Sequence, residues 1–337
     1  MEVMRKSQMT TAEHSQLWSV YMNASTSSAM LKYFHEKAED EEISSMLQKT
    51  LSITSDHLNE IATLFNQENK PVPIGMTEED VNIHAPKLYT DPYFLQHVFQ
   101  LSNVGMFSFS TAISLSVRED IYQFFTNGFH HYNELYQRTK TLLQEKGLYL
   151  YPPSIPTLDE VDFVKKQSFL TGWFGERRPL TAVEITHLFN NIQRNDLGVT
   201  TLTGFGQAAR SKEVKDHIVR GIEMAKKHIS IFRSVLEENQ IPVPMGSESM
   251  VTTSAKEGPF SEKLMLYHVT AMSTLGIGFY GLSISTNIRR DLASHYARLI
   301  GEAGLFSEDG VNIMINHGWL EEPPRMVDRR ELIKSDK

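Results

Sequence analysis

Glutamate and histidine are the residues of this sequence best suited to binding a metal ion or moving a proton. The chain of 337 residues contains no cysteine, which excludes disulfides, thiolate catalysis and iron–sulfur clusters. A di-iron or di-manganese centre in a helical bundle needs a Glu from each of two helices and a Glu-x-x-His pair from each of the other two. Glu184 and His187 have this spacing, but they stand at a helix start, where capping already explains the glutamate.

Four histidines form two pairs separated by 171 residues, and these are the metal-ligand candidates: His57, His228, His97 and His268. Thr54 and Ala225 stand three residues before the first pair, so neither histidine of that pair belongs to a Glu-x-x-His motif. On parallel helices, His57 and His97 would lie roughly 15 Å apart along the axis. We therefore expect semi-buried imidazoles that bond a hydroxyl or a carbonyl across helices. A site for iron or manganese remains the alternative, and no catalytic or cofactor-binding residue is assigned.

The 171-residue spacing belongs to a repeat that runs through most of the chain. The same shift superposes PVPIG at 71–75 on PVPMG at 242–246, without a gap from Thr10 to Pro153. One constant offset over such a length indicates two copies of one domain. We predict a first bundle over 1–150, a linker over 151–179, a second bundle over 180–325 and a polar C-terminal tail over 326–337.

Each copy contains four stretches with the hydrophobic spacing of a helix. In the first copy, about twenty residues without clear periodicity follow the second helix, and the third and fourth helices, over 91–116 and 118–146, meet at a short corner. Two short hairpins joined by one long crossover are typical of the ferritin-like four-helix bundle. The predicted fold is all-α, with two tandem ferritin-like up-down-down-up four-helix bundles packed as a pseudo-dimer.

Charged residues near the helix ends are assigned to structural roles. Thr10 and Thr181 each precede a glutamate by three residues, which is the capping-box spacing. An Arg-x-Asp motif recurs at the corner between the third and fourth helices of each copy. The expected caps and corner residues are Glu13, Glu184, Arg118, Asp120, Arg289 and Asp291.

Two tracts of small residues permit two interpretations. They are GMFSFSTAISLS at 105–116 and GIGFYGLSISTN at 276–287, both in the third helix of a copy. Small side chains let two helices approach closely, and they can also line a ligand channel. Close packing is the expectation, and a channel is the alternative.

The linker is rich in aromatic side chains, which are rare in solvated tethers. Its aromatic residues are Phe163, Phe169, Trp173 and Phe174. We expect this segment to pack between the two bundles.

Several tracts of the sequence resemble a known family. The linker, TAVEITHLFNNIQ at 181–193, RRDLASHYARL at 289–299 and DGVNIMINHGWLEEPP at 309–324 are similar to the Bacillus-group proteins of domain of unknown function 3231. The resemblance implies two tandem ferritin-like bundles, a relationship to spore coat protein F and a setting in spore-forming bacteria. It brings no catalytic residues with it.

Composition narrows the classes of function further. A net charge of −8 without a basic block argues against nucleic-acid binding. No run of eighteen apolar residues predicts a transmembrane segment, and the start MEVMRKSQMT lacks the apolar core of a classical secretion signal. We expect a cytoplasmic or spore-associated protein.

The expected function is that of a non-enzymatic structural or interaction protein. Its expected partners are the second repeat, another copy of the chain or spore-coat proteins. The alternatives are a ferritin-like metal-dependent oxidase or peroxide-handling enzyme, and a small-molecule binder that uses a cavity between the third and fourth helices.

Overall fold

The computed structural model describes residues 8–156, 159–173, 177–243, 250–253, 255 and 257–329. Within these residues the chain is helical, with two isolated β-bridges and no longer strand. The first half contains α1 (Thr11–Lys37), α2 (Glu41–Gln67), α3 (Asp91–Leu115) and α4 (Glu119–Glu145). The second half contains α5 (Ala182–Ala208), α6 (Lys212–Glu238), α7 (Glu262–Thr286) and α8 (Arg290–Asn316). Two short 3-10 helices are η1 (Glu78–Asp80) and η2 (Gln167–Leu170).

The predicted all-α class is confirmed, and the structural repeat coincides with the sequence repeat. Each of α5 to α8 begins and ends 171 residues after its counterpart in α1 to α4. None of the helices in the described part of the chain is long and apolar enough to span a membrane.

Corner hydrogen bonds define the directions of the helices in the first half. The carboxylate of Asp91, at the start of α3, accepts hydrogen bonds from the backbone N–H groups of Glu39 (2.8 Å) and Asp40 (2.6 Å), at the corner between α1 and α2. Glu13, at the start of α1, accepts from the N–H groups of Val117 (2.8 Å) and Arg118 (2.7 Å), at the other end of α3. Helices α2 and α3 therefore run in the same direction, opposite to α1 and α4. The ferritin-like assignment itself stays a prediction.

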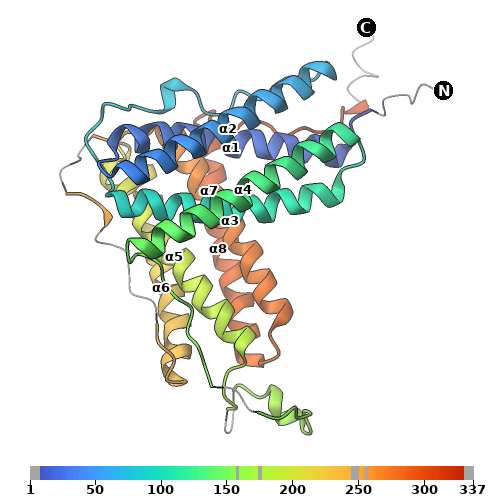
Figure 1. Cartoon of the computed structure of the whole chain (residues 1–337), viewed down its shortest axis with the longest axis vertical. Helices are drawn as coiled ribbons and strands as arrows, with labels where there is room; N and C mark the ends of the chain where they lie inside the picture. The colour runs from blue at the N-terminus through green and yellow to red at the C-terminus, as the bar shows by residue number, and fades with distance from the viewer. Residues whose placement is uncertain are drawn as a thin grey trace.

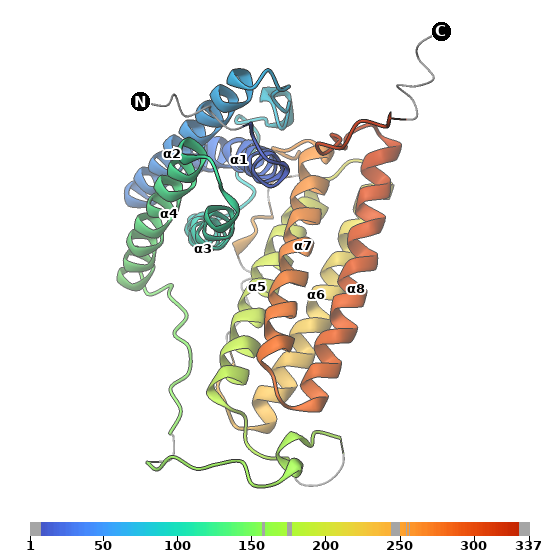
Figure 2. The ribbon, with the colours of Figure 1, turned by 90° about the vertical axis from the view of Figure 1, so that its right-hand side faces the viewer.

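The two halves cross each other and share a core. In Figure 1 helices α1 to α4 run across the view and α5 to α8 run down it, and Figure 2 shows the first half packed against one end of the second. The two crossover segments pair antiparallel through bridges between Val81 and Phe260 and between Tyr89 and Val251. The hydroxyl of Tyr89 donates a hydrogen bond to the carbonyl of Thr201 (2.7 Å) and so ties the first crossover to α5. The repeats thus pack internally.

The hydrophobic core is continuous in the first half but divided in the second. One large cluster extends from the first half across the interface, through Phe34, Phe260 and Phe205, whose rings lie edge to face. A separate, smaller cluster fills the far end of the second half, around Phe232 and Tyr296. A gap in the apolar packing therefore separates the two ends of α5 to α8.

The linker does not pack between the two halves, so this prediction is wrong. Figure 2 shows it descending from α4 and passing around the far end of α5 to α8. The side chain of Phe163 is 81% exposed and that of Trp173 is 53% exposed. Phe169 packs under the guanidinium of Arg178 at 4.2 Å, and Phe174 lies outside the described residues. The helices of the two halves contact each other directly, and the linker runs outside this interface. Residues 330–337 of the predicted polar tail also lie outside the described part.

The glutamates predicted as caps occupy helix starts. The side chains of Thr10 and Thr181 each accept a hydrogen bond from the backbone N–H of the glutamate three residues later. The carboxylate of each glutamate in turn accepts one from the backbone N–H of its threonine. Arg178 also pairs with both carboxylate oxygens of Glu184 (2.8 Å each).

The Arg-x-Asp motifs form ion pairs at the corners, and Asp120 also accepts a hydrogen bond from the backbone N–H of Ile121 (3.0 Å) in the first turn of α4. Arg118 pairs with Asp120 and with Glu68 at the end of α2, and Arg289 forms a two-pronged pair with Asp291 (2.9 and 2.7 Å). Neither arginine side chain caps the helix that it precedes. Both guanidinium groups are buried, and the pair of Arg118 with Glu68 connects the start of α4 to the end of α2.

Candidate functional site

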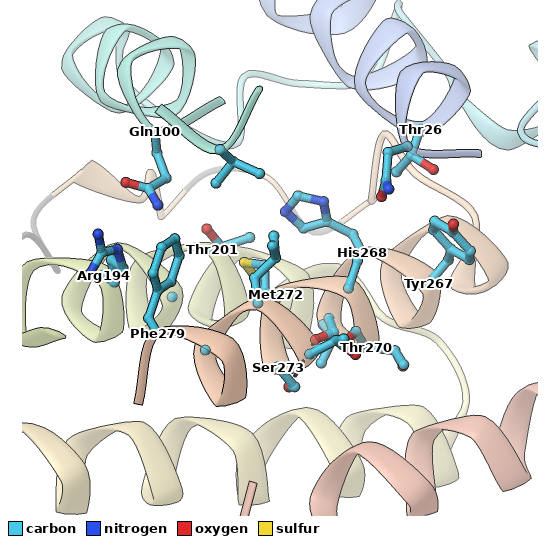
Figure 3. Close-up of a pocket in the computed structure, with 18 of the residues that line it drawn as sticks. Thr26, Gln100, Arg194, Thr201, Tyr267, His268, Thr270, Met272, Ser273 and Phe279 are labelled. Carbon is cyan, nitrogen blue, oxygen red and sulfur yellow. Dashed lines mark hydrogen bonds between the residues drawn. The ribbon is translucent and has the colours of Figure 1, made fainter. Parts of the chain in front are cut away.

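A cavity of about 640 Å³ occupies the gap in the core of the second half. It is lined by α5, α6, α7 and α8, by the segment after α8 and, across the interface, by α1, α3 and Tyr132 of α4. Figure 3 shows His268 reaching from α7 toward the first half, while Thr270 and Ser273 point to the other side of α7. The cavity therefore runs along α7 and is bounded by both repeats.

The cavity exists because the second repeat lacks an aromatic ring that fills the first. In the first half the ring of Tyr132 lies against Gly105, so closely that a Cβ atom on this glycine would be 2.4 Å from it. At the equivalent positions of the second half stand Ala303 and Gly276, and a Cβ atom on Gly276 would meet nothing within 4 Å. The tract of the first repeat packs closely against α4, and residues of both tracts line the cavity.

A chain of polar groups crosses the wall of the cavity. The side-chain amide of Asn195 donates to the hydroxyl of Tyr280 (2.8 Å), which lies 3.0 Å from Nδ1 of His228. Nε2 of the same imidazole faces Glu302 at 3.4 Å. Burial lowers the pKa of His228 despite the opposing effect of Glu302. The neutral imidazole can then accept from the tyrosine and donate to the carboxylate.

This chain is specific to the second repeat. The first repeat has Phe109, Ala24 and His131 at the positions of Tyr280, Asn195 and Glu302. Histidine occurs at both His57 and His228, but only the second has polar partners. The two repeats therefore place the same residue in different chemical environments.

Arg194 lies at one end of the cavity. Its guanidinium stacks on the ring of Phe279 at 3.7 Å, and Nη1 is 3.4 Å from the side-chain oxygen of Asn191. Its Nε is buried without a hydrogen-bond partner, and no carboxylate of the described residues pairs with it. Burial lowers the pKa of Arg194 to about 10, so the side chain still carries its charge at neutral pH.

The sequence predicts that His57 and His228 both bond a hydroxyl or a carbonyl. His228 bonds the hydroxyl of Tyr280, whereas His57 bonds neither kind of group. Both of its ring nitrogens are buried without a partner, among the rings of Phe109, Phe124 and Tyr132. Burial, with a smaller effect of His131, lowers the pKa of His57 to about 4. The rings packed against it offer no hydrogen bond to either nitrogen, and the polar side chains nearby, such as His131, are not bonded to it. A hollow of about 170 Å³ lies beside it.

His97 and His268 meet at the interface between the repeats. Their ring centroids are 5.8 Å apart, and burial lowers their pKa values to about 3 and about 4. Equivalent residues that contact each other mark a pseudo-twofold axis. The sequence did not predict this contact because spacing along a chain does not identify which residues meet across an interface.

The four candidate histidines do not gather into one site. His97 and His268 form one pair, while His57 and His228 lie in the middle of separate halves. Among the described residues, no three His, Asp or Glu side chains are placed to hold a metal ion. The iron or manganese site stays a prediction.

Sequence reasoning missed the residues that shape the cavity. Arg194, Asn195, Tyr280 and Ala303 each differ from the residue 171 positions earlier, which is Asn23, Ala24, Phe109 or Tyr132. A position-by-position comparison of the copies could have revealed them, because three of these changes add polarity or charge and the fourth removes a ring.

The sequence matches one protein family twice, over residues 2–161 and again over 168–332. The chain belongs to the DUF3231 family, described as "Protein of unknown function". The family resemblance predicted from the sequence is therefore confirmed. No curated protein matches the chain.

One solved structure is similar to part of the chain. It is a "putative spore coat protein" from Bacillus halodurans C-125, with 17% sequence identity and a TM-score of 0.41. The match covers 45% of this chain and 98% of the other.

Proposed function

We propose that this protein binds a small, largely apolar molecule in the cavity of its second repeat. The observation that carries the proposal is the contrast between Tyr132 against Gly105 and Ala303 beside Gly276. One repeat has a filled core and the other a cavity at the same place, although both have the same helices. Apolar side chains that face an unfilled space lack the packing contacts that the first repeat makes, so a space of this size favours a function in which a molecule fills it.

The lining of the cavity is typical of a ligand site. Small-molecule sites commonly measure about 300–1,000 Å³ and combine an apolar lining with a few placed polar groups. Here Leu202, Met224 and Val269 supply apolar surface, while Tyr280 and His228 supply a polar chain. The lining provides both the driving force for burial and groups that orient a ligand.

The cavity is compatible with the role expected from the sequence. A binding protein needs no catalytic group, and the first repeat, with its filled core, serves as a structural partner of the second. We include in the proposal the ferritin-like form of both bundles and a cytoplasmic or spore-associated setting, both supported by the family resemblance.

The test uses N-phenyl-1-naphthylamine, a neutral apolar dye that fluoresces when it leaves water. Titration of the full chain should give saturable binding of one dye per chain. Ala303→Tyr places in the second repeat the ring that fills the first, and it should weaken dye binding at least about tenfold, the effect of about 1.4 kcal/mol. Gly276→Leu, which fills the same space from α7, should do the same.

The matched control is Gly301→Tyr, which adds the same ring to the exposed side of the same helix. It should leave dye binding unchanged. Unsaturable binding to the wild type, or equal binding to wild type and both filled variants with unchanged helical circular dichroism, would show that the cavity is not the site.

A further inference from the structure

The cavity carries one formal charge. Among the described residues that line it there is no Lys, Asp or Glu, and Arg194 is the single arginine. The histidines of the lining have pKa values lowered by burial and are neutral at pH 7. A lone cation in an apolar lining is an unusual feature, because buried charges are normally paired.

The hydrogen-bonding capacity of Arg194 is largely unused. A guanidinium has five N–H donors, and here one of them makes a single long contact with Asn191 while Nε has none. The stack on Phe279 holds the guanidinium plane in place. The side chain therefore presents an oriented, positively charged set of donors to the cavity.

This arrangement, the guanidinium stacked on a ring, occurs in the second repeat and not in the first. Asn23 and Ser108 occupy the equivalent positions in the first repeat, so neither the charge nor the ring beneath it has a counterpart there. In the view of Figure 3, the amide of Gln100 extends from α3 toward the end that holds Arg194 and Phe279. It is an additional polar group at that end.

We infer that the ligand is an apolar molecule with one carboxylate group, and that Arg194 binds this carboxylate. The inference rests on the proposed function and specifies its ligand class. A planar guanidinium matches a carboxylate with two parallel hydrogen bonds, which an alcohol or an amine cannot reproduce. The apolar body of the ligand lies along α7, beside Met272 and Val269.

The experiment measures displacement of bound N-phenyl-1-naphthylamine by dodecanoate, dodecan-1-ol and dodecylammonium, each below its micellar concentration at pH 7.5. The three compounds share a chain length and differ in the head group. Dodecanoate should displace the dye at a concentration at least about tenfold lower than dodecan-1-ol, because a hydrogen bond to a charged group outweighs one between neutral groups. Dodecylammonium should be the weakest of the three.

Arg194→Met should remove the preference for the acid, so that dodecanoate and dodecan-1-ol displace the dye at concentrations within about twofold of each other. Both compounds are measured on the same variant, so a change in its dye affinity does not alter this comparison. Arg194→Lys should retain part of the preference. Arg210→Met is the matched control, because it removes one exposed positive charge outside the cavity, and it should behave as wild type.

The outcomes separate this inference from the proposed function. Equal displacement by acid and alcohol in the wild type would overturn the carboxylate assignment while dye binding still supported the cavity as a site. An acid preference that persists in Arg194→Met would overturn the role of Arg194. Absence of dye binding to the wild type would instead overturn the proposed function.

Discussion

At the scale of single residues, equivalent positions of the two repeats have different chemistry. His57 and His228 occupy the same place in their helices, yet the first is surrounded by rings and the second bonds Tyr280. A buried polar group without a partner lowers the stability of the fold by roughly 1–3 kcal/mol, so removing such a group stabilises the protein. Removing one member of a hydrogen-bonded pair destabilises it, because the other member is left unpaired. The same substitution should therefore have opposite effects at the two positions.

We predict that His57→Leu raises the free energy of unfolding by about 1 kcal/mol and that His228→Leu lowers it by about 1–2 kcal/mol. The two variants serve as controls for each other, since the removed atoms and the helix position are the same. Urea unfolding at pH 7.5, followed by circular dichroism, measures both. A loss of stability in His57→Leu as large as that in His228→Leu would contradict the assignment of His57 as unpaired.

At the scale of secondary-structure elements, carboxylates at the corners define how the hairpins meet. Asp91 and Glu262 stand at equivalent helix starts. Each carboxylate accepts hydrogen bonds from two backbone N–H groups at the corner between the preceding two helices. Such bonds satisfy donors at a helix start that have no partner within the helix. They also connect the crossover to the first hairpin in each repeat.

Asp91→Ala should lower the free energy of unfolding by about 2–3 kcal/mol, because two charge-assisted hydrogen bonds and the pair with Lys87 are lost. Glu145→Ala, an exposed carboxylate at the end of α4, should change it by less than about 0.5 kcal/mol. Urea denaturation again provides the measurement. Similar values for both variants would mean that the corner bonds contribute little to stability.

At the scale of the whole molecule, the two repeats meet at a pair of histidines, of which His97 is buried and His268 also lines the cavity. His97 and His268 are neutral in the folded chain because burial lowers their pKa values to about 3 and about 4. In the unfolded chain both titrate near 6.5. Between these values the unfolded state binds more protons than the folded state, so stability falls as the pH decreases below about 6.5.

His97→Leu should reduce this loss of stability. Each histidine that is protonated only when unfolded lowers the free energy of unfolding by about 1.4 kcal/mol per pH unit. At pH 6.5 the unfolded histidine is already half protonated, so between pH 6.5 and pH 5 the variant should lose about 1.6 kcal/mol less than wild type. Urea unfolding at both pH values tests this, and parallel losses in variant and wild type would show that His97 titrates normally in the folded chain.

The sequence by itself determined the repeat, the helices and the caps. Hydrophobic spacing, prolines and the capping pairs at Thr10 and Thr181 act over a few residues, so they can be read along the chain. The offset of 171 residues likewise needed no structure. These local signals also predicted the directions of the helices, since short corners produce hairpins and a long crossover does not.

Only the tertiary structure decided where the site lies. The cavity beside Gly276 depends on the side-chain volumes contributed by several helices, and the contact of His97 with His268 depends on how the repeats cross. Arg194 became a candidate for carboxylate binding only when the described residues around it proved to contain no acid partner. Packing and charge pairing are properties of residues brought together from distant parts of the chain, and periodicity within one helix does not specify them.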